Sequence, residues 1–122
     1  MEITWSLIAS HAYQFRTMGM DADTSVIVLG YSAPQASLRD VARLALQSLG
    51  TTVVEVLPTA VLSEDVDQGT SEDLTSFFVS SDYIIDCTDE KLSLNLNIEE
   101  IRLRGTQIYV DGKTNWTPVN AA

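Results

Sequence analysis

The chain is 122 residues long, which is enough for one domain whose hydrophobic core needs no disulfide bonds. Its 17 acidic residues outnumber 7 basic ones and give a net charge of -10. That charge argues against nucleic acid and anionic membranes as partners, because both are bound through Lys and Arg. No apolar run approaches the roughly 20 residues that a membrane-spanning helix requires.

Cysteine usage and the first 20 residues indicate the compartment. Cys87 is the only cysteine, so the chain forms no internal disulfide, as expected in a reducing interior. Residues 1–20 contain Glu2 and His11 but no basic segment and no small-residue cleavage site, so we expect no secretory signal. We therefore predict a cytoplasmic protein. Because Cys87 lies in an apolar run, we expect a small core residue rather than a reactive thiol.

The first predicted element is an amphipathic helix over residues 2–18, where apolar side chains recur at roughly helical spacing. Gly19 suits the position that follows a helix. Val26–Leu29 is apolar on both faces, a pattern typical of a central strand in a parallel sheet. A second helix, with Pro34 in its first turn and an apolar stripe along one side, runs to Gly50.

The second half of the chain repeats this alternation. A strand over residues 53–57 stops at Pro58, and residues 62–73 form a long acidic connection without apolar periodicity, which is either functional or mobile. The remaining expected elements are a short helix at 74–79, a strand at 82–87, a helix capped by Asn97 and ended by Gly105, a strand at 107–111 and a polar tail at 112–122.

Alternating strands and helices predict an α/β fold, a three-layer open parallel sheet of about four strands that is flavodoxin-like or Rossmann-like, with an N-terminal helix. We expect a single α/β domain over residues 1–122, with that helix within 1–20 and the polar tail at 112–122. Two strand orders, 2-1-3-4 and 3-2-1-4, both place the first strand centrally, and the choice between them stays open.

Ligands of open parallel sheets lie beyond the carboxyl ends of the strands, where the strand order switches. Dinucleotide binding is not expected there, since the first turn holds a single glycine, and no P-loop is present. A phospho-acceptor domain would need an acidic pair directly after the first strand, where the sequence has Gly30, Tyr31 and Ser32. The side chains that we predict to contact a small ligand are Tyr31, Ser32, Thr59, Asp86 and Thr88.

Metal and acid–base chemistry find little support in the sequence. His11 is the only imidazole, so a zinc or iron site with two or more histidines cannot form within one chain. Asp21 and Asp23 lack the further oxygen ligands of a metal loop and indicate a solvated turn. We predict no metal and no cofactor in this chain. Tyr31 or Asp86 as a general base is the alternative, but strand-end hydrogen bonds explain both residues more simply.

Several segments between Ser25 and Asp111 form a further pattern. They are the strand Val26–Leu29, the helix start Tyr31–Pro34, the helix 38–50 leading into Thr52–Pro58, the strand Ser81–Asp86 and the strand Gly105–Val110. In this order they resemble the N-terminal domain of a metalloenzyme family, the aminopeptidase T-type leucyl aminopeptidases and the related 2,5-dihydroxypyridine dioxygenases. The helix before Met18 is similar to the opening of that domain.

The resemblance implies an accessory role. The family's metal ligands lie in a C-terminal domain, after the segment that matches Gly105–Val110, so no ligand position carries over to this chain. We expect a small accessory subunit, not catalytic alone, that pairs with a larger metal-dependent subunit. That partner would be a ring-cleaving dioxygenase of aromatic-compound catabolism or a peptidase-like hydrolase, holding Fe or another divalent metal.

Other assemblies and functions stay open at this point. Trp116 and the tail would dock on the catalytic partner or remain frayed, and a homo-oligomer is the other expected assembly. The alternative function is a stand-alone small-ligand-binding α/β module. An independent enzyme is the least expected of the three functions.

Overall fold

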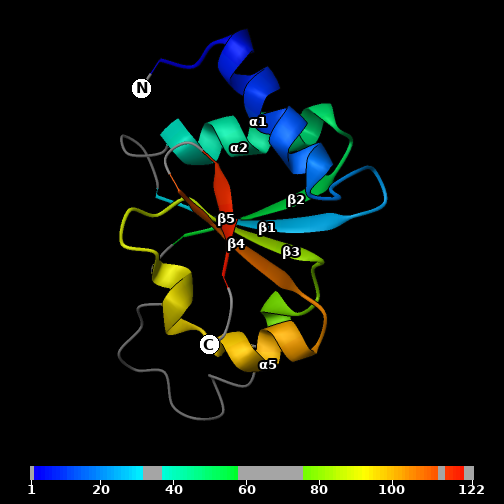
Figure 1. Cartoon of the computed structure of the whole chain (residues 1–122), viewed down its shortest axis with the longest axis vertical. Helices are drawn as coiled ribbons and strands as arrows, with labels where there is room; N and C mark the ends of the chain where they lie inside the picture. The colour runs from blue at the N-terminus through cyan, green and yellow to red at the C-terminus, as the bar shows by residue number, and fades with distance from the viewer. Residues whose placement is uncertain (1, 32–36, 58–75, 113–114, 120–122) are drawn as a thin grey trace.

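The computed structural model describes residues 2–31, 37–57, 76–112 and 115–119. The predicted helix start at Pro34, the connection 62–73 and the first part of the 74–79 helix lie outside the described residues, while residues 76–78 are helical. The elements, labelled as in Figure 1, are α1 (Trp5–Thr17), β1 (Ser25–Leu29), α2 (Ser37–Ser48), β2 (Thr52–Val56), β3 (Tyr83–Asp86), the 3-10 helix η1 (Leu92–Asn95), α5 (Ile98–Leu103), β4 (Gln107–Asp111) and β5 (Trp116–Pro118).

The strands form one sheet in the order β2-β1-β3-β4-β5. The first four run parallel, and β5 pairs antiparallel with β4. In Figure 1, α1 and α2 cover one face of the sheet, and residues 76–78, η1 and α5 cover the other. The predicted three-layer α/β fold with an N-terminal helix is therefore confirmed, and of the two strand orders that the sequence left open, the structure has 2-1-3-4. None of the helices in the described ranges is long and apolar enough to cross a bilayer.

The central position of β1 follows from its sequence. Val26 and Val28 pack with the α1 and α2 side chains, whereas Ile27, one pleat away, packs in the cluster on the α5 face. Successive side chains of a strand point to opposite faces, so only a strand covered on both sides can be apolar throughout. At the edge of the sheet, β2 is more open, and Val54 keeps 44% of its surface exposed.

Two helix ends confirm the predicted boundaries. Gly19 follows α1 with a φ of +108°, and a Cβ at this position would lie 2.7 Å from the Tyr83 hydroxyl oxygen. That hydroxyl donates to the Met18 carbonyl oxygen at 3.2 Å and ties the end of α1 to β3. At the other end of the chain, Asn97 caps α5 by accepting a hydrogen bond from the Glu100 N–H at 3.3 Å.

The prediction of a polar tail over 112–122 is wrong for residues 116–118, which form the fifth strand. The Gly112 N–H donates to the Asn115 carbonyl at 2.9 Å and closes the turn, and the Val119 N–H donates to the Ile108 carbonyl at 2.8 Å. Trp116 is buried rather than frayed or free to dock on a partner.

Candidate functional site

The strand order places a switch point between β1 and β3. From β1 the chain continues to β2 on one side, while β3 pairs with β1 on the other. Leu29 and Asp86 are partners in this pairing, so Tyr31 and Thr88 each follow their strand by the same number of residues. The connections that leave these two strands run to opposite faces of the sheet, and ligands of such sheets bind at this kind of position. Ser32 and Thr59, which the sequence analysis assigned to the same site, lie outside the described residues.

Asp86 is fully buried at the end of β3, and both of its carboxylate oxygens are occupied. Oδ1 accepts hydrogen bonds from the Thr88 N–H at 2.9 Å and the Thr88 hydroxyl at 2.5 Å. Oδ2 accepts from the Ser93 N–H at 2.9 Å and the Ser93 hydroxyl at 2.6 Å. Buried carboxylates persist when their oxygens are satisfied in this way. The carboxylate therefore holds the loop that leads into η1.

This network changes how the two predicted residues are understood. Asp86 and Thr88 do lie together at the carboxyl edge, as predicted, but they bind each other. A general base needs a lone pair directed at its substrate, whereas the oxygens of Asp86 face four protein donors. The simpler interpretation made from the sequence, strand-end hydrogen bonding, accounts for Asp86. Ser93, which was not singled out, completes the network from seven residues further along the chain.

Arg39 lies over the end of β1 and was also missed. A Cβ on Gly30 would lie 2.7 Å from the Arg39 Cβ, so only glycine lets α2 approach the strand end this closely. The Arg39 side chain is 16% exposed and lies 3.8 Å from the Asp40 carboxylate. Within the part of the chain that the structure describes, neither the buried Arg39 Nε nor the buried Tyr31 hydroxyl has a hydrogen-bond partner. Arg39 and Tyr31 thus bring a guanidinium group and a phenol to the switch point.

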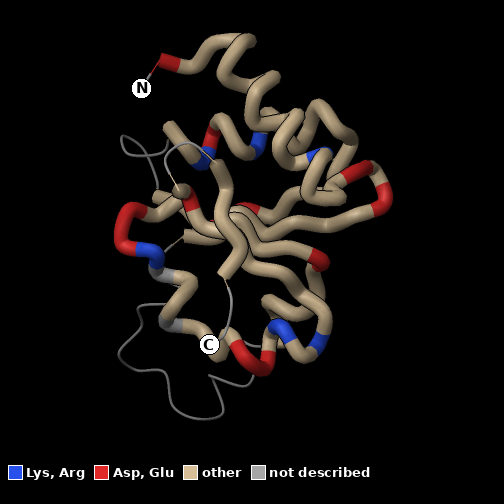
Figure 2. Tube along the Cα trace, viewed as in Figure 1, with Lys and Arg blue, Asp and Glu red and all other residues tan. Residues whose placement is uncertain are grey.

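A small pocket of about 210 Å³ opens at the carboxyl ends of β3 and β4. Its position agrees with the predicted edge, and of its lining residues Thr88 belongs to the five side chains predicted to contact a ligand. Lys91 is the only non-glycine residue with a positive φ, +53°, among the described residues. Figure 2 shows the charged loop after β3 on the outside of the molecule. The lining residues are Thr88, Asp89, Lys91, Asp111 and Gly112.

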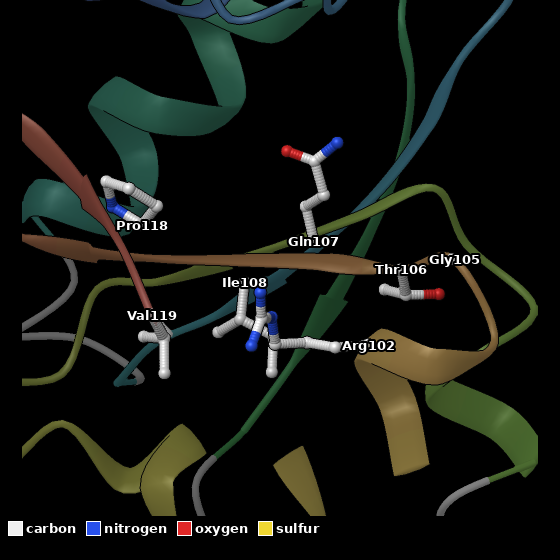
Figure 3. Close-up of a pocket in the computed structure, with 7 residues that line it drawn as sticks. All are labelled: Arg102, Gly105, Thr106, Gln107, Ile108, Pro118 and Val119. Carbon is white, nitrogen blue, oxygen red and sulfur yellow. The ribbon is translucent and has the colours of Figure 1, made fainter. Parts of the chain in front are cut away.

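A larger pocket, of about 290 Å³, lies at the opposite edge, where β4 begins. In Figure 3 the Arg102 side chain reaches from α5 toward Ile108. Pro118 and Val119 close the pocket from the β5 side. Its lining is mostly neutral, and none of the residues predicted for the site contributes to it. The remaining lining residues are Gly105, Thr106 and Gln107.

Cys87 is a buried member of the core, as predicted. Burial raises the pKa of its thiol well above the ordinary value, and the neighbouring Asp86 carboxylate adds to the shift. The thiol therefore stays protonated and unreactive at neutral pH. Among the described residues, no group of three or more His, Cys, Asp and Glu side chains is placed to hold a metal ion.

His11 and Trp116 form a contact that the sequence analysis did not predict. The indole N–H of Trp116 donates to His11 Nδ1 at 3.0 Å, and the Trp116 backbone N–H donates to Gln14 Oε1 at 3.2 Å. The Trp116 ring also packs against Phe15, with ring centroids 5.4 Å apart. β5 is thereby bound to α1, and His11 serves an intramolecular role.

This contact should make stability depend on pH. Burial lowers the pKa of His11 from 6.5, and the Asp111 carboxylate opposes part of that shift. The unfolded chain therefore binds a proton more readily than the folded chain. The free energy of unfolding should fall as the pH drops below 6.5 and level off below the lowered pKa. Urea unfolding between about pH 5.5 and 8, above the range in which most carboxylates titrate, measures this.

The matched control is His11→Asn, whose side-chain oxygen can accept the indole hydrogen bond without titrating. We expect the pH dependence of the urea midpoint in this range to flatten in the variant. An equal slope in both proteins would show that another group causes it.

Comparison with known proteins identifies the fold but no family: no family model matches, and no curated protein matches. Among solved structures, a 2,5-dihydroxypyridine dioxygenase from Pseudomonas putida KT2440 is similar with a TM-score of 0.62 and 19% identity, over 90% of this chain and 35% of that chain. IdnL1 is similar with a TM-score of 0.61 and 17% identity, over 95% of this chain and 20% of that chain. A luciferase-like enzyme from the nonluminescent mealworm Zophobas morio is similar with a TM-score of 0.57 and 21% identity, over 88% of this chain and 23% of that chain.

At these identities the comparison establishes a shared fold and no more. The similarity to the dioxygenase agrees, at that level, with the resemblance seen in the sequence, and the aminopeptidase side of that resemblance stays a prediction. This chain spans between a fifth and about a third of the length of these neighbours. The sheet of this protein is thus an architecture that larger enzymes contain as one part.

Proposed function

We propose that this protein is an accessory α/β module that acts by pairing with a larger metal-dependent catalytic partner. The observation that carries the proposal is the asymmetry of coverage. The fold similarity extends over 88–95% of this chain but over only 20–35% of the neighbouring proteins. A unit of this architecture therefore occurs beside the rest of a larger enzyme, and here the two parts would be separate chains.

The chemistry of the strand ends supports this role. Asp86, the carboxylate best placed to act as a base, has both oxygens engaged by Thr88 and Ser93. Cys87 is held as a protonated core residue by its burial. Asp86 and Cys87 are thus used to maintain structure. Reactive groups would come from the partner.

The partner that fits best is a ring-cleaving dioxygenase acting in aromatic-compound catabolism, since one neighbour is a dioxygenase of a dihydroxypyridine. A peptidase-like hydrolase is the alternative that the sequence resemblance favours. In either case Fe or another divalent metal would be held by the partner. A lone, buried cysteine is compatible with a reducing compartment, so we propose that the complex forms in the cytoplasm.

Isolation of a tagged copy from cells that naturally make the protein tests this function. We expect a larger chain to co-purify in a fixed ratio, and the complex to carry a divalent metal and an activity that this chain lacks alone. Native mass spectrometry gives the stoichiometry. Recovery of this chain without any larger companion, at several salt concentrations, would contradict the accessory role.

A second candidate function is a stand-alone small-ligand-binding module, which the pocket at the carboxyl ends of β3 and β4 favours. Its volume of about 210 Å³ is below the roughly 300–1,000 Å³ of drug-sized sites, so it suits only a small polar ligand. Thermal-shift screening of small acids, amines and sugars would find such a ligand, because binding to the native state raises the melting midpoint. A specific hit should lose its effect in Lys91→Ala, and retention of the effect would exclude this pocket.

A further inference from the structure

The outer face of α1 exposes two large aromatic side chains. Trp5 keeps 83% of its surface exposed and Tyr13 keeps 65%. Ala9, midway between them, is exposed as well, so the three residues form one stripe at positions i, i+4 and i+8. Figure 1 shows the N-terminal half of α1 extending past α2, away from the sheet. Tryptophan and tyrosine are the residues most enriched at the centres of protein interfaces.

The charge of this face differs from that of the rest of the molecule. α1 contains no acidic residue, and Arg16 is its only Lys or Arg, whereas the chain as a whole carries a net charge of -10. Figure 2 shows α1 almost free of charged positions. Two copies of an acidic protein repel one another across most of their surfaces. The α1 face is therefore a surface on which two copies can approach without that repulsion.

The stripe of Trp5, Ala9 and Tyr13 is also complementary to the same stripe of a second copy that runs in the opposite direction. Trp5 and Tyr13 lie at equal distances along the helix on either side of Ala9, while Glu2, which precedes α1, and Arg16 each lie seven residues from Ala9 in the sequence. In two antiparallel helices related by a twofold axis at Ala9, Trp5 meets Tyr13 of the second copy, about 6 Å from the axis along the helix. Glu2 then approaches Arg16 of the second copy. Alanine at the axis lets the two helices come close.

We propose that the protein forms a homodimer through antiparallel packing of two α1 helices about Ala9. This assembly does not depend on the proposed function, because the β2 edge and the α5 face remain available to a catalytic partner. Arg16 already lies over the Tyr13 ring, with its guanidinium carbon 5.9 Å from the ring centroid. In the dimer, Trp5 of the second copy would pack beside this pair.

Analytical ultracentrifugation of the purified chain over a wide concentration range tests the aromatic contacts. We expect a reversible dimer that Trp5→Ala weakens by at least about 30-fold, since a buried aromatic anchor is lost twice per dimer. Leu103→Ala is the matched control, because Leu103 is 76% exposed but lies on α5. It should leave the dimer unchanged. A chain that stays monomeric, or one that Leu103→Ala weakens as much as Trp5→Ala, would overturn the proposal.

A charge-swap experiment tests the antiparallel register. Glu2→Arg and Arg16→Glu should each weaken the dimer by about 10-fold, because each places like charges together at both ends. An equimolar mixture of the two variants should dimerise as well as the natural chain, since both end pairs are then attractive. Circular dichroism confirms that each variant folds. If the mixture of the two variants does not recover dimerisation, the antiparallel geometry is wrong. A chain that is monomeric alone and binds a larger protein through α1 would also overturn the proposal.

Discussion

Replacement of Asp86 by Asn should destabilise the protein by about 3 kcal/mol or more. The amide oxygen can keep two of the four hydrogen bonds, but the amide NH₂ then faces the donors of the other neighbour, either Thr88 or Ser93. Each buried donor left without an acceptor costs about 1–3 kcal/mol. The loss is measured as the change in free energy of unfolding in urea.

Asp89→Asn is the control for this experiment, because it makes the same chemical change three residues away at an exposed position. It should change stability by less than about 0.5 kcal/mol. The pair separates the structural role of Asp86 from catalysis. If Asp86→Asn folds with natural stability and abolishes an activity, Asp86 is a catalytic base and the network described above is not its function.

Replacement of Trp116 by Ala should have a comparably large effect, about 3–5 kcal/mol, as is usual for a large aromatic side chain removed from a core. The indole packs against Phe15 and donates to His11, so its loss leaves a cavity between β5 and α1. Chemical denaturation monitored by circular dichroism measures the change. Trp116→Phe retains a ring but removes the N–H donor, and should cost about 1 kcal/mol for that hydrogen bond in addition to a smaller packing loss.

Trp5→Ala is the matched control because it removes the other tryptophan, which is exposed. At dilutions where the chain is monomeric, it should change the free energy of unfolding by less than about 0.5 kcal/mol. Equal effects of the two substitutions would mean that residues 116–118 do not pack on α1. The prediction of a polar tail would then be right for these residues.

The fold was predictable where its causes are local. A run that is apolar on both faces identifies the central strand at Val26–Leu29, and the conformational freedom of Gly19 identifies the end of α1. The Asn97 side chain caps α5 by accepting a hydrogen bond from the Glu100 N–H, only three residues away. In each case the physical reason acts within a few residues, so the residues themselves carry the signal.

The fifth strand was missed because it is short and because the packing that buries Trp116 is distant in sequence. Only three residues pair with β4, one of them a proline. The side chains that accept hydrogen bonds from Trp116, those of His11 and Gln14, lie 105 and 102 residues before it. Periodicity cannot detect a three-residue strand, and local propensity cannot reveal which helix will cover it. The sequence shows that Trp116 is a large hydrophobic residue, but it does not show which residues surround it in the fold.

The sequence predicted that Asp86 and Thr88 lie near one another, but not the network that joins them to Ser93. The topology rule located the carboxyl edge, and Asp86 and Thr88 do lie there. That Asp86 binds Ser93 depends on the turn into η1, which spacing alone does not specify. Arg39 reaches the end of β1 from the neighbouring helix because Gly30 leaves room for its stem. Such contacts arise only once helix and strand are packed.

The central claim is that the chemistry of the complex belongs to the partner and that this chain supplies a folded module. The most direct test takes the purified complex, removes its metal, separates the two chains and measures which of them rebinds iron by elemental analysis. We predict one equivalent on the larger chain and none on this one. Stoichiometric iron bound by this chain alone, and lost on substitution of its own side chains, would contradict the account.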